Sequence, residues 1–123
     1  MRRVLLDSVI LIDHMNQRAE ATDYLRREMG NCAVSPVTRA EVLVGVDHEV
    51  HERAAGMLDQ FPCLPIDASV ADLAARLRRE YRWKLPDALQ LAVARSYGCV
   101  FATRNTKDFS PNRHDDVVVP YRL

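Results

Sequence analysis

The sequence predicts an α/β fold, a three-layer α/β/α sandwich with a central parallel sheet, and three observations support it. Short apolar, β-prone runs recur along the 123 residues. One or two segments of helical periodicity follow each run, and glycine or proline marks many of the boundaries. Strands that alternate with helices favour a parallel sheet covered on both faces, because each helix returns the chain to the same end of the sheet.

The first half of the chain predicts two strands and three helices, over 3–7, 10–15, 19–29, 32–35 and 36–46. The strand at 3–7 reads RVLLD and is apolar enough to be buried on both faces. Gly30 stops the second helix, because glycine adopts the left-handed conformation that ends many helices. Pro36 stands where a third helix opens, in the first turn that tolerates proline.

The second half of the sequence predicts helices over 48–60, 67–81 and 87–97, and strands over 63–66, 100–103 and 116–119. Asp67 or Ser69 caps the helix that ends at Tyr81, whose apolar residues form one stripe. Pro86 lies in the first turn of the next helix, which is apolar nearly all round and is therefore expected to be buried.

Composition indicates one folded domain, 1–123, with a modest core. Hydrophobic residues make up 48% and charged residues 28%, and 17 basic side chains balance 17 acidic ones, so total charge indicates no partner. Cys32, Cys63 and Cys99 show no Cys-x-x-Cys spacing and are expected to be small buried hydrophobes in a reducing compartment. Asp7 and Asp13 interrupt the apolar start, which argues against a signal peptide, and the protein is expected to be cytoplasmic.

Acidic or amide side chains stand where several predicted elements meet. Asp7 ends the first strand, Glu41 and Asp87 lie in helix openings, and Asn105 and Asp108 follow a late strand. Each alone has a structural explanation: Asp7 could cap a helix, Thr38 and Glu41 match a capping box, and Asp87 would favour a helix N-terminus by roughly 0.3–1 kcal/mol.

Their joint placement favours a metal site, because the chain-direction ends of parallel strands gather at one edge of the sheet. Carboxylates about 5 Å apart at an effective dielectric of about 20 repel by about 3 kcal/mol per pair. A hard divalent cation with oxygen ligands would reverse that repulsion. Zn²⁺ is disfavoured, because no Cys or His lies in these motifs.

Four stretches in this order and spacing carry a resemblance to a known family: VLLDSVILID, VSPVTRAEVLVGV, KLPDALQLAVARSYG, and VFATRNTKDF followed by VVVPY. The chain resembles the PIN-domain ribonucleases, and among them the VapC toxins of bacterial VapBC toxin–antitoxin pairs. The resemblance extends over essentially the full length. It implies a PIN-like fold and a metal-dependent endoribonuclease, the toxin of a type II toxin–antitoxin pair.

The resemblance also implies roles for individual residues. Asp7, Glu41 and Asp87 match the family's three main metal-binding acids. The hydroxyl residues near the metal are matched by Ser8 and Thr103. The chain departs from the family pattern at the fourth acidic position, because Asn105 stands where the family often has an acid, and Asp108 follows three residues later. This departure puts the occupancy of a second metal in doubt.

The implied chemistry is hydrolysis of RNA phosphodiester bonds by an activated water. Mg²⁺, for which Mn²⁺ can substitute, would be held by Asp7 and Asp87, with Glu41 as a further ligand or as the residue that orients the water. Basic residues close to these acids in sequence are candidates to contact RNA phosphates: Arg82, Lys84, Arg104 and Lys107. The single tryptophan, Trp83, either stacks on a base or packs against the domain, and packing is the commoner arrangement.

The resemblance implies two protein partners as well. A small cognate antitoxin would wrap the domain with its C-terminal segment and block the acidic pocket. A homodimer is also expected, with a contact drawn from apolar residues of the early helices: Ile10, Leu11, Tyr24 and Leu25.

Two other classes of function stay open at this point. A phospho-receiver-like signalling domain also binds Mg²⁺ at a sheet edge, but it usually has paired acids after the first strand, where this chain has Asp7 followed by Ser8. A PIN-like fold that only binds its partners is the other alternative, with Asn105 as its sign.

Overall fold

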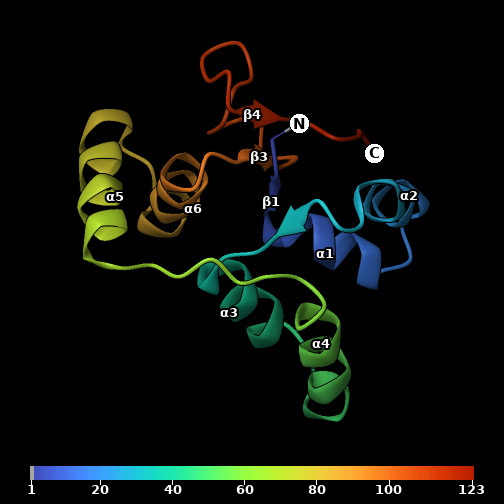
Figure 1. The fold of residues 1–123 in the computed structure, drawn as a ribbon. Helices are drawn as coiled ribbons and strands as arrows, with labels where there is room; N and C mark the ends of the chain where they lie inside the picture. Colours follow the sequence, from blue (N-terminus) through green and yellow to red (C-terminus); the bar gives the residue numbers. More distant parts are fainter. Residues whose placement is uncertain (1) are drawn as a thin grey trace.

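The computed structural model describes residues 2–123, which form one parallel sheet flanked by helices (Figure 1). The four strands of this part of the chain are β1 (Val4–Leu6), β2 (Cys32–Ala33), β3 (Val100–Ala102) and β4 (Val117–Val118). Their order in the sheet is β2-β1-β3-β4, and every neighbouring pair is parallel. The fold class that the sequence predicts is therefore confirmed.

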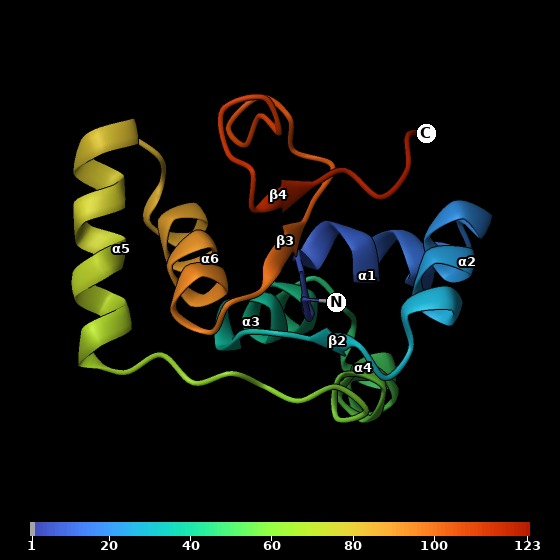
Figure 2. The same cartoon turned by 45° about the horizontal axis from the view of Figure 1, so that its top comes forward.

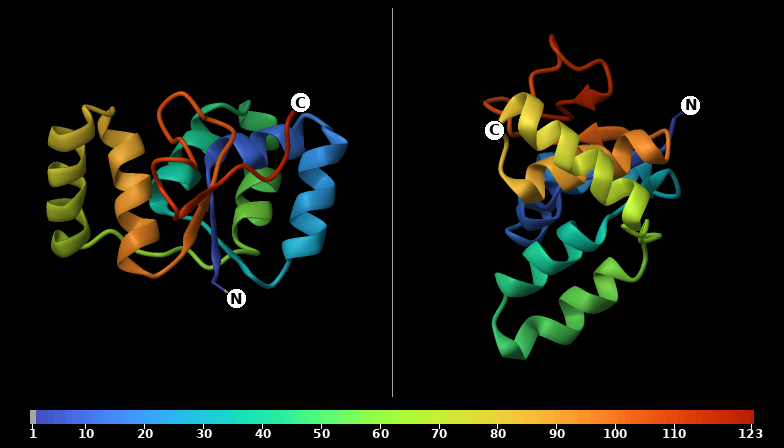
Figure 3. Two further views of the ribbon diagram at one scale, coloured as in Figure 1. Left: turned by 90° about the horizontal axis from the view of Figure 1, so that it is seen from above. Right: turned by 90° about the vertical axis from the view of Figure 1, so that its left-hand side faces the viewer.

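Helices connect and cover the strands (Figure 2). Their bounds are α1 (Ser8–Met15), α2 (Ala19–Glu28), α3 (Pro36–Val44), the 3₁₀ turn η1 (His48–Val50), α4 (His51–Leu58), α5 (Ala68–Tyr81) and α6 (Leu85–Ser96). Seen from above, α5 and α6 lie on one side of the strands and α1 and α2 on the other (Figure 3). This is the expected three-layer arrangement.

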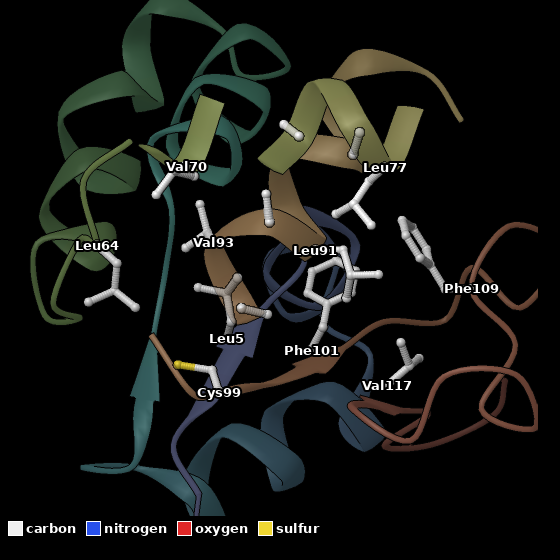
Figure 4. Packing of buried hydrophobic residues seen from close by; sticks show 14 of the residues in the cluster. Leu5, Leu64, Val70, Leu77, Leu91, Val93, Cys99, Phe101, Phe109 and Val117 are labelled. Carbon is white, nitrogen blue, oxygen red and sulfur yellow. The ribbon is translucent and has the colours of Figure 1, made fainter. Parts of the chain in front are cut away.

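The central strand β1 is buried on both faces because its residues are all apolar. Leu5 points into a core shared with α5 and α6, where it lies among residues such as Leu91 and Phe101 (Figure 4). Val4 and Leu6, which alternate with Leu5, belong to a second core under α1 and α2. The two cores fix the strand between the helical layers, and with it the residue that follows the strand.

The segment predicted as a strand at 63–66 is not one. It makes a single parallel bridge, between Cys63 and Val34, and Cys63 is exposed rather than buried. Pro62 and Pro65 flank the bridge, and a proline has no N–H to donate to a neighbouring strand. The helix predicted over 48–60 is also divided, into η1 and α4.

The residues expected to supply a dimer contact lie in the interior instead. Ile10 and Leu11 are fully buried in the second core, and Tyr24 and Leu25 are almost fully buried beside them. They hold α1 and α2 against the sheet, so this part of the prediction was wrong. Within residues 2–123, no helix has the length and apolarity needed to span a membrane.

Candidate active site

The first acid of the site, Asp7, is placed by the register of the sheet. Leu6 of β1 pairs with Ala102 of β3, so the next residues, Asp7 and Thr103, emerge side by side at the carboxyl end of the sheet. Thr103 Oγ1 donates a 2.6 Å hydrogen bond to Asp7 Oδ2. Asp7 Oδ1 accepts from the Ser8 backbone N–H at 2.8 Å, so the same side chain caps α1, as the sequence predicts.

The hydroxyl group of Ser8 connects the second acid, Glu41, to the first acid, Asp7. Ser8 Oγ donates to Glu41 Oε1 at 3.0 Å and lies 3.5 Å from Asp7 Oδ1. The capping box that Thr38 and Glu41 match, the alternative explanation for Glu41, does not form, because Ser35 caps α3 by accepting from the Thr38 N–H. Glu41 is thereby free of the helix terminus and faces the end of β1.

The third acid, Asp87, lies in the first turn of α6, as expected. All three acids line one open cavity of about 270 Å³, together with Ser8, Val9, Arg104 and Asn105. They come from the end of β1, from α3 and from α6, so segments distant in sequence do meet here. The carboxyl-edge arrangement expected from the topology is what brings them together.

Burial raises the pKa of all three carboxyls, and repulsion by neighbouring acids adds to it for Glu41 and Asp87. Desolvation, then the charges of Asp108, Asp7 and Glu41, raise the pKa of Asp87 to about 6, against a partial opposing effect of Lys84. Desolvation also raises the pKa of Asp7, although hydrogen bonds from Thr103 and Ser8 oppose it. For Glu41, desolvation and the charge of Asp7 raise the pKa and the Ser8 hydroxyl opposes them. Such perturbed acids in a cavity are typical of functional sites.

The fourth acidic position is built from an amide and an acid. Asn105 lines the cavity, and its Nδ2 donates to Asp108 Oδ2 at 3.0 Å. Thr103 Oγ1 accepts from the Asn105 N–H at 3.0 Å, which ties this turn to Asp7. Asp108 does not line the cavity, but of the neighbouring charges it raises the pKa of Asp87 the most. Asn105 therefore stands between the cavity and its fourth negative charge.

The proposed RNA contacts fall in different places. Arg104 lines the acidic cavity, but it is engaged in a bidentate pair with the buried Asp13, at 2.6 and 3.0 Å. Lys84 is exposed just before α6, and its charge acts on Asp87. Arg82 and Lys107 are exposed and line a separate cavity.

The single tryptophan packs rather than presenting a free ring. Trp83 is 6% exposed and stacks on Tyr81 with ring centroids 4.6 Å apart. Its Nε1 donates to the Asp108 backbone oxygen at 3.0 Å. Of the two arrangements that the sequence left open for it, packing against the domain is the one found.

Sequence reasoning missed a buried polar network under the acids. Gln90, on α6, accepts a hydrogen bond from Ser35 Oγ and donates to Thr38 Oγ1, and Thr38 Oγ1 donates to the Leu6 carbonyl oxygen. A polar residue inside the otherwise apolar run DALQLAVA was the available signal. The partners of Asp13 were missed too, since Tyr121 Oη also donates to it, at 2.7 Å.

Comparison with known proteins decides the family. The model of the PIN domain matches residues 4–112. This chain belongs to the PIN-domain family. No curated protein matches it. The resemblance to PIN-domain proteins that the four sequence stretches indicated is confirmed.

Solved structures share the whole fold of this PIN domain. A chain of a toxin–antitoxin complex from Klebsiella pneumoniae is 37% identical, with a TM-score of 0.90 over 98% of this chain and 99% of that one. FitAcB from Neisseria gonorrhoeae shares 23% identity, with a TM-score of 0.81 and coverage of 98% and 99%. DNA-bound VapBC from Salmonella typhimurium shares 20% identity, with a TM-score of 0.74 and coverage of 89% and 91%.

Proposed function

We propose that this PIN domain is a metal-dependent endoribonuclease and the toxin of a type II toxin–antitoxin pair. The observation that carries the proposal is the convergence of Asp7, Glu41 and Asp87 on one cavity from three separate elements. The 37% identical chain belongs to a toxin–antitoxin complex, which supports the assignment to such a pair. The proposed reaction is hydrolysis of an RNA phosphodiester bond.

The donor set fits Mg²⁺, and Mn²⁺ as its substitute, because the acids that line the cavity offer only oxygen ligands. Within residues 2–123, no group of three or more His, Cys, Asp or Glu side chains is arranged to hold a metal ion. Mg²⁺ takes one or two protein carboxylates and keeps several waters, so a complete cage is not required. Asp7 and Asp87 would hold the ion, with Glu41 bound directly or through water.

A bound divalent ion supplies two things here: it lowers the pKa of a water ligand and offsets the charge that builds on the phosphate. The protein's own residues set the geometry. Thr103 and Ser8 fix the two oxygens of Asp7, and Ser8 holds Glu41, which would orient the attacking water. Asn105 places a neutral amide at the fourth position, with Asp108 behind it, so a single ion is the proposed occupancy.

Cations around the acids would hold the RNA backbone. Lys84 is exposed, and its charge acts on Asp87. Arg82 and Lys107 are exposed at the separate cavity and would contact the backbone away from the bond that is cut. Phosphate contacts of this kind position a nucleic acid without reading its sequence. Arg104 is proposed to contribute less, because Asp13 already occupies its guanidinium.

Two partners belong to the same proposal. A small antitoxin would cover the acidic cavity and block access of RNA. A homodimer is proposed as well, through surfaces other than Ile10, Leu11, Tyr24 and Leu25, which are buried. Light scattering at increasing concentration tests the dimer: a monomeric mass throughout would contradict it.

The test of the activity is cleavage of a structured RNA by purified protein with Mg²⁺ or Mn²⁺, and with EDTA. Metal-dependent fragments are expected, and Asp7→Asn and Asp87→Asn should abolish them. Asp72→Asn, an exposed acid on α5, is the matched control and should cleave normally. Fragments that persist in EDTA or in both site variants would contradict the proposal.

Asn105 in place of an acid favours one alternative, a PIN domain that binds its partners without cutting RNA. The same experiment separates the two, because this alternative yields no fragments with any metal. A receiver-like signalling domain does not fit a chain that the PIN-domain model matches over residues 4–112.

A further inference from the structure

A second cavity, of about 280 Å³, lies on the other side of the turn that borders the acidic one. Lys107 and Asp108 line it, while Asn105 of the same turn lines the acidic cavity. The two residues that face opposite cavities are joined by the 3.0 Å hydrogen bond from Asn105 Nδ2 to Asp108 Oδ2. The turn that contains Asn105 and Asp108 therefore borders both cavities.

Three cations line the second cavity, Arg82, Lys107 and Arg113, against the two acids Glu80 and Asp108. In the described chain, 2–123, none of these three cationic side chains forms an ion pair or a hydrogen bond. All three are exposed, so they can meet a ligand without breaking an existing interaction.

Neighbouring arginines behave differently. Arg78 donates to the Trp83 carbonyl oxygen, Arg95 pairs with Asp116 at 2.8 Å, and Arg104 pairs with Asp13. These three arginines make contacts within the protein. In the part of the chain that the structure describes, the side chains of the three cations in the second cavity make no ion pair or hydrogen bond.

Arg82 also has an unfavourable backbone conformation. It caps the C-terminus of α5 with φ 58° and ψ 29°, the left-handed region. Glycines have positive φ just after α2 and α6, Gly30 at 91° and Gly98 at 68°, and after α1 another non-glycine residue, Gln17, has φ 64°. A non-glycine residue in this region is strained, and such outliers gather at functional sites.

Aromatic packing and a hydrogen bond connect the residues that form the wall of the cavity. Trp83 stacks on Tyr81, packs against Phe109 with ring centroids 4.9 Å apart, and donates to the Asp108 carbonyl oxygen. These contacts join the end of α5 to the loop between β3 and β4. A ligand held here would therefore keep a fixed position relative to the acidic cavity.

We propose that this cavity is a backbone subsite for single-stranded RNA, in which Arg82, Lys107 and Arg113 hold a phosphate other than the one that is cut. Cations without a partner, in a polar cavity that is open to solvent, are suited to bind the phosphate groups of RNA. The proposal rests on the proposed nuclease function and extends it from the acidic cavity to a second contact on the same RNA.

The test compares two substrates. A dinucleoside monophosphate contains only the phosphate that is cut, so the subsite has nothing to hold. The double variant Lys107→Gln/Arg113→Gln should cleave it with a kcat/KM within about twofold of the wild type, but should cleave an oligoribonucleotide about tenfold less efficiently. Arg76→Gln/Arg79→Gln, which removes two exposed cations of α5 outside the cavity, is the matched control and should lose neither.

Binding gives an independent readout in an Asp7→Asn background, where cleavage is absent. The slope of log affinity for the oligoribonucleotide against log salt should flatten by about 0.7 for each phosphate that the double variant no longer neutralises. Arg82→Gly should raise the melting temperature, because glycine relieves the left-handed strain, and yet weaken RNA binding.

The outcomes separate the subsite from the nuclease. Equal losses on both substrates, or no loss on either, would overturn the subsite while leaving the nuclease intact. If the wild type cleaves neither substrate, the nuclease proposal fails, and the binding slopes still decide whether the cavity holds RNA. An unchanged slope in the double variant would overturn the subsite in that case as well.

Discussion

Gln90 Nε2 donates a 2.7 Å hydrogen bond to Thr38 Oγ1 in the interior of the protein, and this contact joins two helices that each carry an acid of the site. Thr38 lies one turn before Glu41 on α3, and Gln90 lies one turn after Asp87 on α6. Thr38 Oγ1 in turn donates to the carbonyl oxygen of Leu6, the residue before Asp7. One buried network therefore links all three acid-bearing elements.

Replacing Gln90 should weaken metal binding as well as stability. Gln90→Leu leaves the Ser35 hydroxyl without an acceptor, which should cost roughly 1–3 kcal/mol. Because the three acids then lose their shared support, affinity for Mn²⁺ measured by calorimetry should fall about tenfold. Leu77→Ala, in the core between α5 and α6, is the control: it should destabilise by roughly 2–5 kcal/mol and leave Mn²⁺ affinity unchanged. Equal metal affinity in both variants would refute the positioning role.

Asp87 should make the metal-free protein less stable as pH rises. Its pKa is about 6 in the folded protein against an ordinary value of 3.8, so the folded state holds the proton more tightly between these values. Stability is then lost as pH rises from about 4 to above 6. At pH 8 without metal, Asp87→Asn should raise the free energy of unfolding by about 1–2 kcal/mol, allowing for partial solvent screening. At pH 4 it should leave the free energy of unfolding unchanged.

Urea unfolding with EDTA at both pH values measures this effect, and Asp72→Asn on exposed α5 is the control. With saturating Mn²⁺ at pH 8, the wild type should be more stable than Asp87→Asn, because only the wild type keeps the carboxylate that binds the ion. A variant that is less stable than the wild type in EDTA at pH 8 would contradict the expected repulsion among the acids.

The pair of Arg104 and Asp13 should be more important for folding than for RNA binding. Burial opposes ionisation of Asp13, but hydrogen bonds from Arg104 and Tyr121 outweigh it and lower the pKa. The stabilisation is therefore present at neutral pH and lost as pH falls through the folded pKa. Arg104→Met should cost roughly 3 kcal/mol at pH 7, because it strands a buried carboxylate.

The double variant Arg104→Met/Asp13→Leu should recover part of that loss, since it removes the stranded charge as well. Denaturant unfolding of the single and double variants at pH 7 provides the comparison. A single variant as stable as the wild type would show that the pair contributes nothing.

Trp83 should report the integrity of the turn that separates the two cavities. Because its ring is buried, iodide should quench its fluorescence weakly in the native protein and strongly in urea. Trp83→Phe keeps the ring packing but removes the hydrogen bond to the Asp108 carbonyl oxygen, which should cost about 1 kcal/mol. Strong quenching of the native protein by iodide would be inconsistent with the packing described.

The sequence was sufficient for the architecture because local patterns and topology agree. An apolar run followed by Asp7, and a proline followed by Asp87, predicted where each acid would lie relative to a strand or a helix. Parallel topology then predicted that they meet at one edge. The segment at 63–66 was misjudged, because its apolar residues match a strand while Pro62 and Pro65 limit its pairing.

The finer geometry depends on contacts that no local pattern encodes. Ser35 competes with Thr38 for the cap of α3, and the residue that forms the cap decides whether Glu41 faces its own helix or Ser8. Arg104 looked like a cation for RNA until its partner Asp13 was placed beside it by the fold. Apolar residues of a short helix, such as Ile10, can cover a core or a partner, and only packing distinguishes these.

An anomalous-scattering map of crystals soaked in Mn²⁺ tests most directly whether the acids form one metal site. One strong peak is expected in the acidic cavity, roughly 2.0–2.2 Å from carboxylate oxygens of both Asp7 and Asp87. A map without a peak at these two side chains, or with its strongest peak elsewhere on the molecule, would contradict the proposed metal site.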